Sequence, residues 1–282
     1  MQSGSYPSVS EGVLDSRVRG NDGQSAAMKI ATWNVNSLRV RLPHVADWLK
    51  ANPVDAIGLQ ELKLPDEKFP HEDVKALGYQ ATVFGQKTYN GVAILSRHEL
   101  ADVSRGIPGF EDPQSRVIAA TVNGVRIVNV YVPNGQSVGS EKYAYKLRWL
   151  AALRDYVRDE LARYPKLALM GDFNIAPADA DVHDPVAWAG QVLCSDAERA
   201  ALREIEALGL TDSFGLFPAP EQRYTWWDYR AAAFRRNMGL RLDHILVSSA
   251  LASKCDVHHI DLTPRKLNLP SDHAPVRLDL RA

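Results

Sequence analysis

Apolar residues recur along the chain in two alternating patterns from Met28 onward. Short apolar runs typical of strands alternate with longer segments of helical period, which predicts an α/β domain with layers of sheet and helix. The predicted strands cover 28–33, 55–60, 79–84, 91–96, 116–122, 125–132, 166–171, 242–248 and 274–280. The predicted helices cover 43–51, 71–77, 140–162 and 196–208.

Turn residues refine this pattern. Asn123-Gly124 joins two of the predicted strands, and this pair is the commonest signal for a tight hairpin, so part of the sheet is expected to be antiparallel. Gly78 and Gly209 occupy positions where glycine typically ends a helix. No linker or tandem repeat interrupts residues 28–282, which predicts one domain.

The first 27 residues differ from the rest of the chain. They are rich in serine and glycine and lack the apolar segment of about 7 to 15 residues that defines a secretory signal. We expect residues 1–27 to be a disordered tail, or an extension from an upstream start codon, and residues 28–282 to be the folded domain.

Composition limits the compartment and the class of partner. The chain has 282 residues, and 33 basic against 34 acidic residues leave a formal charge of -1, so any surface for nucleic acid must be local. Cys194 and Cys255 belong to no CxxC pattern, which indicates neither a zinc site nor a disulfide framework and favours a reducing cytoplasm. No apolar run approaches the roughly 18 residues of a membrane span, so no membrane association is expected.

Polar side chains follow many of the predicted strands. One such ending is more often a turn former or a helix cap than a catalyst, but six in one domain indicate a shared site if the strand ends converge. These residues are Asn34, Glu61, Tyr131 with Asn134, Asp172 with Asn174, Asp243, and Asp272 with His273. Converging carboxylates are costly unless a cation binds, and oxygen ligands favour Mg²⁺ or Mn²⁺. Phosphate chemistry is the natural partner of such a cation.

Seven motifs occur in the same order as in the exodeoxyribonuclease III family of DNA repair nucleases, within the endonuclease/exonuclease/phosphatase superfamily. They are ATWNVNSLR, LQELK, NVYVPNG, GDFNIAP, YTWWDYR, GLRLDHIL and PSDHAPV. The chain resembles this family over 28–282. The resemblance implies a four-layer α/β sandwich, with two packed mixed β-sheets flanked by helices and the site at one rim. It also implies Mg²⁺-dependent hydrolysis of DNA phosphodiesters, with Mn²⁺ as a substitute.

The resemblance assigns roles at the metal end of this site. Glu61 is the expected principal metal ligand, Asn34 lies close by, and Asp272 shapes the same end. The family tyrosine that touches the phosphate is matched by Tyr131, although a half-buried strand aromatic is an equally good reading of that position.

Four further residues carry the expected chemistry at the phosphate. By the same resemblance Asp172 accepts the proton of the attacking water, and Asn174 holds that aspartate or the phosphate. His273 contacts the scissile phosphate and is oriented by Asp243.

Residues 223–241 contain five arginines against one aspartate, interleaved with aromatic residues. Arginines can neutralise backbone phosphates and aromatic rings can stack on nucleotides, so this is the expected local DNA surface. The resemblance places Trp226 on the sugar at the lesion, and we expect Trp227 to be core. The other expected DNA-binding residues are Lys87, Tyr89, Gly91, Arg116, Arg230 and Arg235, with Arg39 and Arg41 as weaker candidates.

Residues 179–199 depart from the family pattern. They carry His183 and Trp188 near the place where an abasic nucleotide would be accommodated. Our hypothesis is that the imidazole narrows this pocket and favours processing of blocked or damaged 3′ ends over incision at internal abasic sites.

The expected function is therefore a 3′-5′ exonuclease and 3′-end phosphodiesterase/phosphatase, with abasic endonuclease activity left open. The expected partner is double-stranded DNA with damaged or nicked 3′ ends or abasic sites, bound by a monomer. Two alternatives remain: a phosphodiesterase or phosphatase for substrates other than nucleic acid, and a catalytically inactive DNA-binding scaffold. An apolar membrane-contacting loop would favour the first, and loss of an acidic site residue the second.

Overall fold

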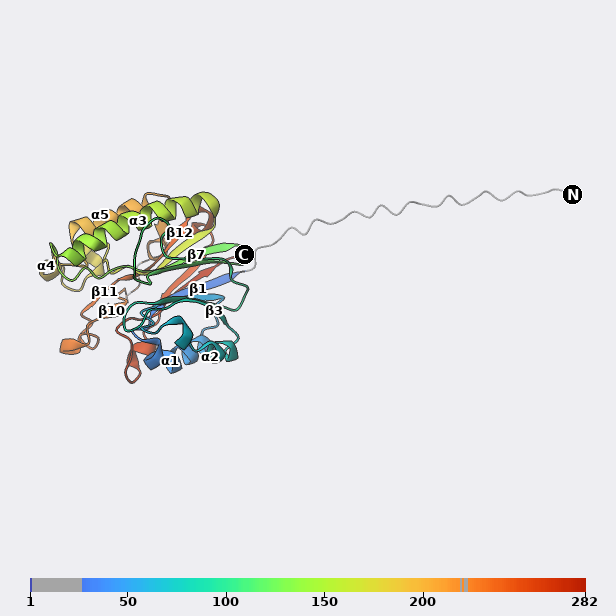
Figure 1. The fold of residues 1–282 in the computed structure, drawn as a ribbon, viewed down its shortest axis with the longest axis horizontal. Coiled ribbons are helices and arrows are strands. Elements are labelled where there is room, and N and C mark those ends of the chain that lie inside the picture. The colour runs from blue at the N-terminus through green and yellow to red at the C-terminus, as the bar shows by residue number, and fades with distance from the viewer. Residues whose placement is uncertain (2–26, 219, 221–222) are drawn as a thin grey trace.

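The computed structural model describes residue 1, residues 27–218, residue 220 and residues 223–282. Apart from its first and last residues, the predicted tail 1–27 lies outside these described residues. Within them the chain forms two six-stranded sheets packed face to face between layers of helix (Figure 1).

The two sheets are both mixed. The strand order in the first is β13 (Cys255–Ile260), β14 (Val276–Leu280), β1 (Met28–Asn34), β2 (Ala56–Gln60), β4 (Val92–Ser96) and β3 (Gln80–Phe84). The order in the second is β5 (Ala101–Arg105), β6 (Val117–Val122), β7 (Val125–Tyr131), β8 (Leu167–Asp172), β12 (Asp243–Ser248) and β9 (Leu210–Asp212). A separate two-stranded ribbon pairs β10 (Trp226–Trp227) with β11 (Gly239–Leu240).

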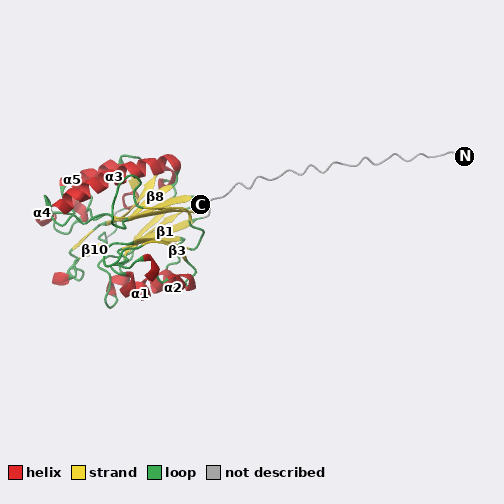
Figure 2. Cartoon of the chain, in the orientation of Figure 1, coloured by secondary structure: helices red, strands yellow, loops and turns green. Residues whose placement is uncertain are grey.

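Helices cover the outer face of each sheet (Figure 2). The first sheet packs on α1 (Leu38–Ala51) and α2 (His71–Ala76), and the second packs on α3 (Glu141–Arg163) and α5 (Asp196–Glu206). Two short helices, α4 (Pro185–Trp188) and α6 (Ser249–Ala252), lie in connections. None of the helices in the described part of the chain is long and apolar enough to cross a membrane.

Three apolar cores hold these layers together. Ile30, Ile127 and Met170 belong to the core between the sheets, while the other two cores lie between each sheet and its helices. Burial of apolar side chains on both faces explains why the central strands are nearly continuous apolar runs. The predicted four-layer α/β sandwich is confirmed.

Strand pairing brings the polar strand ends to one rim. Asn34 lies opposite Gln60 in the parallel pair β1 and β2, so Asn34 and Glu61 emerge at the same end of the sheet. Tyr131 lies opposite Asp172 in the parallel pair β7 and β8, and Asp172 lies opposite Asp243 in β12.

Most predicted elements are confirmed, with informative exceptions at their bounds. The Asn123-Gly124 hairpin joins β6 to β7, and both of its residues have positive φ. The predicted start of the first helix at residue 43 is wrong, because α1 begins at Leu38 and contains Pro43. A proline there removes one N–H that would bond the Arg39 carbonyl, and Arg39 is exposed, so water can replace that bond.

The missed strands are mostly edge strands. β5, β9 and β13 each pair on one side only, and β5 and β13 are largely polar. An edge strand needs no continuous apolar run, so its pattern does not stand out in the sequence.

Candidate active site

Asn34 links the two carboxylates at the centre of the rim. Its Nδ2 donates to Oε1 of Glu61 and to Oδ2 of Asp172, each at 2.9 Å, so these carboxylates face one another across a single amide. Asn34 is fully buried at the end of β1 and Asp172 is 1% exposed at the end of β8. The two sheets therefore contribute one half of the centre each.

A pair of asparagines supports Asp172. The Asn174 backbone N–H donates to Oδ1 of Asp172 at 2.9 Å, and the Asn174 amide donates to the Val132 carbonyl at 3.0 Å. Asn134 in turn donates to Oδ1 of Asn174 at 3.3 Å. Asn174 has a φ of 50°, a left-handed conformation that asparagine tolerates better than most residues. This turn directs the amide of Asn174 back toward the aspartate.

His273 lies between two carboxylates. Its Nδ1 is 2.8 Å from Oδ2 of Asp243, and its Nε2 is 3.6 Å from Oδ2 of Asp172. Burial favours the neutral ring, but the carboxylates of Asp243 and Asp172 outweigh it and raise the pKa of His273 to about 10. The ring is therefore an imidazolium at neutral pH, and its Nδ1 is held by the Asp243 carboxylate.

The acidic groups affect one another's protonation. Burial raises the pKa of Asp172 to about 7, against the lowering effect of His273. Burial, followed by the charges of Glu61 and Asp172, raises the pKa of Tyr131 well above its usual value. The Tyr131 phenol is therefore a hydrogen-bond donor at neutral pH, and the Arg116 guanidinium lies 4.8 Å from the centre of its ring.

Asp272 connects the centre to Trp226. Its Oδ2 accepts from the Trp226 indole at 3.0 Å and its Oδ1 accepts from Nδ2 of Asn36 at 2.9 Å. An isolated bridge also pairs Trp226 with His273. The predicted DNA-contacting tryptophan is thus fixed to the loop that carries the imidazolium, and the role of Asp272 as a metal ligand stays a prediction.

Glu61 is held in an uncommon conformation. Its φ is 52°, a region that costs on the order of 1 to 3 kcal/mol for a residue other than glycine. Nζ of Lys63 lies 3.0 Å from Oε2 of Glu61 and also contacts Oδ1 of Asn36. The strained turn aims the Glu61 carboxylate at the centre, and its side chain keeps 18% exposure to solvent.

The segment 85–91, which carries the predicted DNA contacts Lys87, Tyr89 and Gly91, lies beside Glu61. The Leu62 N–H donates to the Gly91 carbonyl at 3.1 Å, and Gly91 has a φ of 88° that favours glycine. Tyr89 on this segment is 68% exposed. The backbone pairing fixes the segment beside the centre and leaves the tyrosine ring open to a partner.

The arginine-rich segment divides into buried and exposed parts. Trp227 is fully buried and packs on Phe234, which confirms its predicted place in the core. Arg230 and Arg235 are exposed, and Arg230 pairs with Asp228 at 2.6 Å. Arg41 differs from the expectation, because its guanidinium donates to the carbonyls of Asn36, Leu269 and Pro270 and to the Tyr229 hydroxyl. Arg41 therefore connects the loops that carry these groups.

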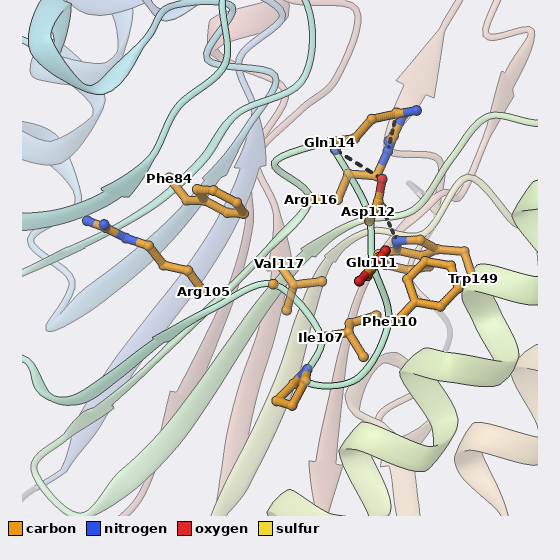
Figure 3. A pocket seen from close by; sticks show the side chains of 12 residues that line it. Phe84, Arg105, Ile107, Phe110, Glu111, Asp112, Gln114, Arg116, Val117 and Trp149 are labelled. Atoms are coloured by element: carbon orange, nitrogen blue, oxygen red, sulfur yellow. Dashed lines mark hydrogen bonds between the residues drawn. The ribbon is translucent and has the colours of Figure 1, made fainter.

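A cavity of about 310 Å³ lies beside Arg116 and away from the carboxylate centre (Figure 3). Asp112 on its wall accepts from the Trp149 indole at 3.1 Å and from the Gln114 N–H at 3.0 Å. Gln114 in turn accepts from Nε of Arg116 at 2.8 Å, and Arg116 donates to the Tyr131 carbonyl at 3.0 Å. The cavity wall therefore supports Arg116, which is only 8% exposed, and its role in DNA binding stays a prediction.

Two sets of oxygen and nitrogen atoms could hold a cation. Ligand atoms of Asp172, Asp243 and His273 lie within 4.8 Å of one another. In that set His273 is protonated, and an imidazolium has no lone pair to offer a metal. Glu61, with Asn34, is the set that a hard cation would prefer, because its carboxylate is partly open.

The sequence analysis missed two side chains of the centre. The Asn36 amide donates to Asp272, and the Asn36 backbone carbonyl accepts from the Arg41 guanidinium. Lys63 pairs with Glu61. Both residues lie inside motifs already quoted, ATWNVNSLR and LQELK. Asn36 lies two positions after Asn34, and Lys63 lies two positions after Glu61. This spacing could have indicated them, because a tight turn after a strand can bring such a neighbour back to the same site.

A four-layer α/β sandwich with carboxylates, amides and an imidazolium at one rim defines an enzyme of the phosphoester-hydrolysing class. The chain belongs to the endonuclease/exonuclease/phosphatase family, whose model matches residues 31–273. This confirms the family predicted from the sequence motifs.

Individual relatives agree with this assignment over most of their length. The chain is 38% identical over 262 residues to exodeoxyribonuclease III of Haemophilus influenzae, covering 88% of this chain and 98% of that protein. A Neisseria 3′ phosphatase, solved with its product DNA hairpin, is 52% identical with a TM-score of 0.89, covering 91% of this chain and 100% of that one. An AP endonuclease from Archaeoglobus fulgidus is 39% identical with a TM-score of 0.86, covering 90% and 100%.

Proposed function

We propose that the protein is a Mg²⁺-dependent DNA repair nuclease of the exodeoxyribonuclease III type, acting as a 3′-5′ exonuclease and a 3′-end phosphodiesterase/phosphatase. The observation that carries this proposal is the convergence of Glu61, Asp172 and His273 on one rim from three distant parts of the chain. The relatives named exodeoxyribonuclease III and 3′ phosphatase support both the nuclease class and DNA as the substrate. The protein acts as a cytoplasmic monomer on double-stranded DNA.

The residues of the rim have different roles in hydrolysis. Asp172, fixed by Asn34 and Asn174, accepts the proton of the attacking water. The imidazolium of His273 and the phenol of Tyr131 donate hydrogen bonds to the phosphate oxygens, whose charge increases in the transition state. Asp243 holds the imidazolium in place.

The donor set fits a hard divalent cation. The rim holds four carboxylates and two cationic side chains, so its negative groups outnumber its positive ones. The carboxylates are those of Glu61, Asp172, Asp243 and Asp272, and the cations are Lys63 and His273. Glu61 and Asn34 would hold Mg²⁺, with Asp272 at the same end. When bound, this ion would draw electron density from a phosphate oxygen and stabilise the charge that develops there.

A basic groove beside Glu61 offers a path for the DNA backbone. The groove measures about 590 Å³, and its charged lining side chains are Arg39, Lys63, Lys68 and Lys87. Each phosphate neutralised by such a side chain releases condensed counterions, so binding there depends on salt. This groove supports the predicted contacts of Lys87 and Arg39 with DNA phosphates.

The two alternatives are less well supported. All the acidic residues that an inactive scaffold would be expected to lose are present, and they meet in one hydrogen-bonded centre. The exposed part of residues 223–241 is basic, with Arg230, Arg235 and Arg236. This composition suits a polyanion better than a membrane.

His183 supports a preference for 3′ ends. The backbone N–H of His183 donates to the Gly239 carbonyl at 3.1 Å, and Nδ1 of the His183 ring is 3.3 Å from the same oxygen. Leu240 of the same strand pairs with Trp226, the proposed sugar contact, and Trp188 lies edge-on to the imidazole at 6.4 Å. An imidazole fixed here narrows the space beside Trp226 that a flipped abasic nucleotide would need. Because Nδ1 donates to the Gly239 carbonyl, Nε2 can donate to a terminal phosphate when the ring is protonated.

Replacing His183 with glycine is expected to shift the substrate preference. Removal of a 3′-phosphate should slow by about 10-fold, the effect of one hydrogen bond to a charged group, while incision of an intact abasic duplex should rise. Turnover on a panel of labelled duplexes, bearing a 3′-phosphate, a nick or an internal abasic site, measures both changes.

Val186→Gly is the matched control, because Val186 is 88% exposed on the same segment. It should leave the preference unchanged. Equal or better incision of the abasic duplex by the wild-type protein, or no effect of His183→Gly, would overturn the proposed preference. Absence of turnover on every DNA in the panel would overturn the nuclease assignment itself.

A further inference from the structure

A buried ammonium lies directly behind the two active-site asparagines. Lys146, on α3, has no exposed surface. Its Nζ donates to the backbone carbonyl of Asn174 at 2.7 Å and to that of Asn134 at 3.1 Å. These asparagines are hydrogen-bonded to each other through their side chains, so one cation fixes the backbones of both partners.

The peptide groups on either side of Asn174 are thereby held from two directions. Its N–H donates to Asp172 at 2.9 Å, on the side of the reacting phosphate, while its carbonyl accepts from Lys146 on the side of the helix. The left-handed turn at Asn174 has no regular ladder of hydrogen bonds to maintain it. A side chain with at least three N–H donors, such as lysine, can bind both carbonyls and a counterion at once.

The counterion of Lys146 extends this support to the segment that carries His183. Glu198 on α5 contacts Nζ of Lys146, and both side chains are fully buried. The Glu198 carboxylate also accepts from the N–H groups of Leu193 at 3.0 Å and Ser195 at 3.1 Å. The Leu193 carbonyl accepts from the Ala176 N–H at 2.8 Å, which closes the path back to β8.

We propose that Lys146 is a positioning residue for hydrolysis: through the carbonyls of Asn134 and Asn174 it fixes the asparagine pair that orients Asp172, and Glu198 keeps the ammonium in place. This inference rests on the proposed function, in particular on the role of Asp172 and Asn174. Misplacement of a reacting group by about 1 Å can reduce turnover by about 100-fold, so a loss of this support should appear in turnover rather than in substrate binding.

The chain contains a matched control for the structural effect of breaking a buried ion pair. Arg126 and Glu160 are 2% and 3% exposed and lie 2.5 Å apart, and Glu160 is also on α3. Arg126 is near the start of β7, at the opposite end of that strand from Tyr131, and contacts the Asp102 carbonyl and Ser104. Arg126→Met therefore removes a cation from a similar environment without touching the asparagines.

The experiment compares Lys146→Met with Arg126→Met on a duplex bearing a 3′-phosphate, at a temperature where melting curves show each variant to be folded. We expect both variants to melt at lower temperature. Lys146→Met should lower kcat by about 10- to 100-fold with KM nearly unchanged, whereas Arg126→Met should keep the wild-type kcat. Lys146→Arg should recover part of the lost kcat. If Lys146→Met does not fold, the double variant Lys146→Met/Glu198→Gln, which removes both charges, takes its place.

A double-mutant cycle with Asp172→Asn tests the route of the effect. If Lys146 acts by orienting Asp172, Lys146→Met should cost much less kcat in the Asp172→Asn background than in the wild type. Wild-type kcat in the Lys146 variant, an equal loss in Arg126→Met, or full additivity with Asp172→Asn would each overturn the inference. If Asp172→Asn itself leaves kcat unchanged, the proposed function of the site fails instead.

Discussion

Replacing Asp172 with asparagine should lower turnover on a 3′-phosphate duplex by about 10²- to 10⁴-fold, the range expected for loss of a general base. Asparagine has nearly the same shape and can still accept the Asn174 N–H that Oδ1 of Asp172 accepts at 2.9 Å. It cannot accept a proton from water. DNA binding should therefore be retained, and steady-state turnover together with fluorescence anisotropy on labelled duplex separates the two effects.

The same substitution should change stability little, because two effects oppose each other. Burial raises the pKa of Asp172 to about 7, so the folded protein disfavours the ionised carboxylate above that pH, and a neutral asparagine removes this cost. Asparagine also places an NH2 group opposite Nδ2 of Asn34, which donates to Oδ2 of Asp172 at 2.9 Å, and two facing donors are unfavourable. Melting curves at neutral pH measure the net effect.

Asp159→Asn on the surface of α3 is the control for the loss of one negative charge, since the Asp159 side chain is 69% exposed. It should leave turnover and melting temperature unchanged. Turnover of Asp172→Asn within a few-fold of the wild type would show that the proton of the attacking water goes elsewhere.

Replacing His273 with glutamine should reduce turnover by about 10²- to 10³-fold, the loss typical of removing one donor that stabilises a developing oxyanion. The imidazolium lies between Asp243 and Asp172 and is the buried cation of the rim. Glutamine can donate a hydrogen bond but carries no charge, so the transition state should lose more stabilisation than the bound substrate. Single-turnover rates at saturating enzyme measure this step without interference from product release.

His258→Gln is the control for the substitution of a partly buried histidine. His258 lies on the edge strand β13, where Nδ1 is 2.9 Å from the Ser213 hydroxyl, and burial lowers its pKa to about 4. Glutamine there should leave the single-turnover rate unchanged. A His273→Gln rate close to that of the wild type would remove the imidazolium from the mechanism.

The sequence predicted the central strands and the rim because both follow from simple periodicity. β1, β2, β7 and β8 are largely buried on both faces, so each is a mostly apolar run that ends in a polar residue. Parallel pairing of β1 with β2 and of β7 with β8 then brings Asn34 to Glu61 and Tyr131 to Asp172. The antiparallel hairpin at Asn123-Gly124 was equally visible, because its turn requires residues that tolerate positive φ.

Contacts that depend on loop conformation were beyond the sequence pattern. Asn36 reaches Asp272 only because Asn36 and Ser37 have φ values of 45° and 91°. Arg41 looks like a phosphate ligand in the sequence but binds backbone carbonyls of a loop more than 200 residues away in the chain. Such pairings are long-range and polar, so they leave no periodic signal in either segment.

Lys146 illustrates the same limit within a helix. It lies on the buried face of α3 beside Tyr143, Trp149 and Leu150, although lysine side chains usually reach solvent. Its burial depends on Glu198 from α5 and on two carbonyls that follow β7 and β8. Only the assembled layers bring these four groups together.

Cleavage in the absence and presence of divalent cation tests most directly whether the rim works as a metal-dependent centre for phosphoester hydrolysis. The protein is stripped of metal with a chelator and dialysed, and then Mg²⁺ is titrated back while cleavage and binding of a labelled 3′-phosphate duplex are followed together. We predict no cleavage by the stripped protein, full recovery with Mg²⁺, and a higher Mg²⁺ requirement for Glu61→Gln. Equal cleavage with every divalent ion removed would contradict the account.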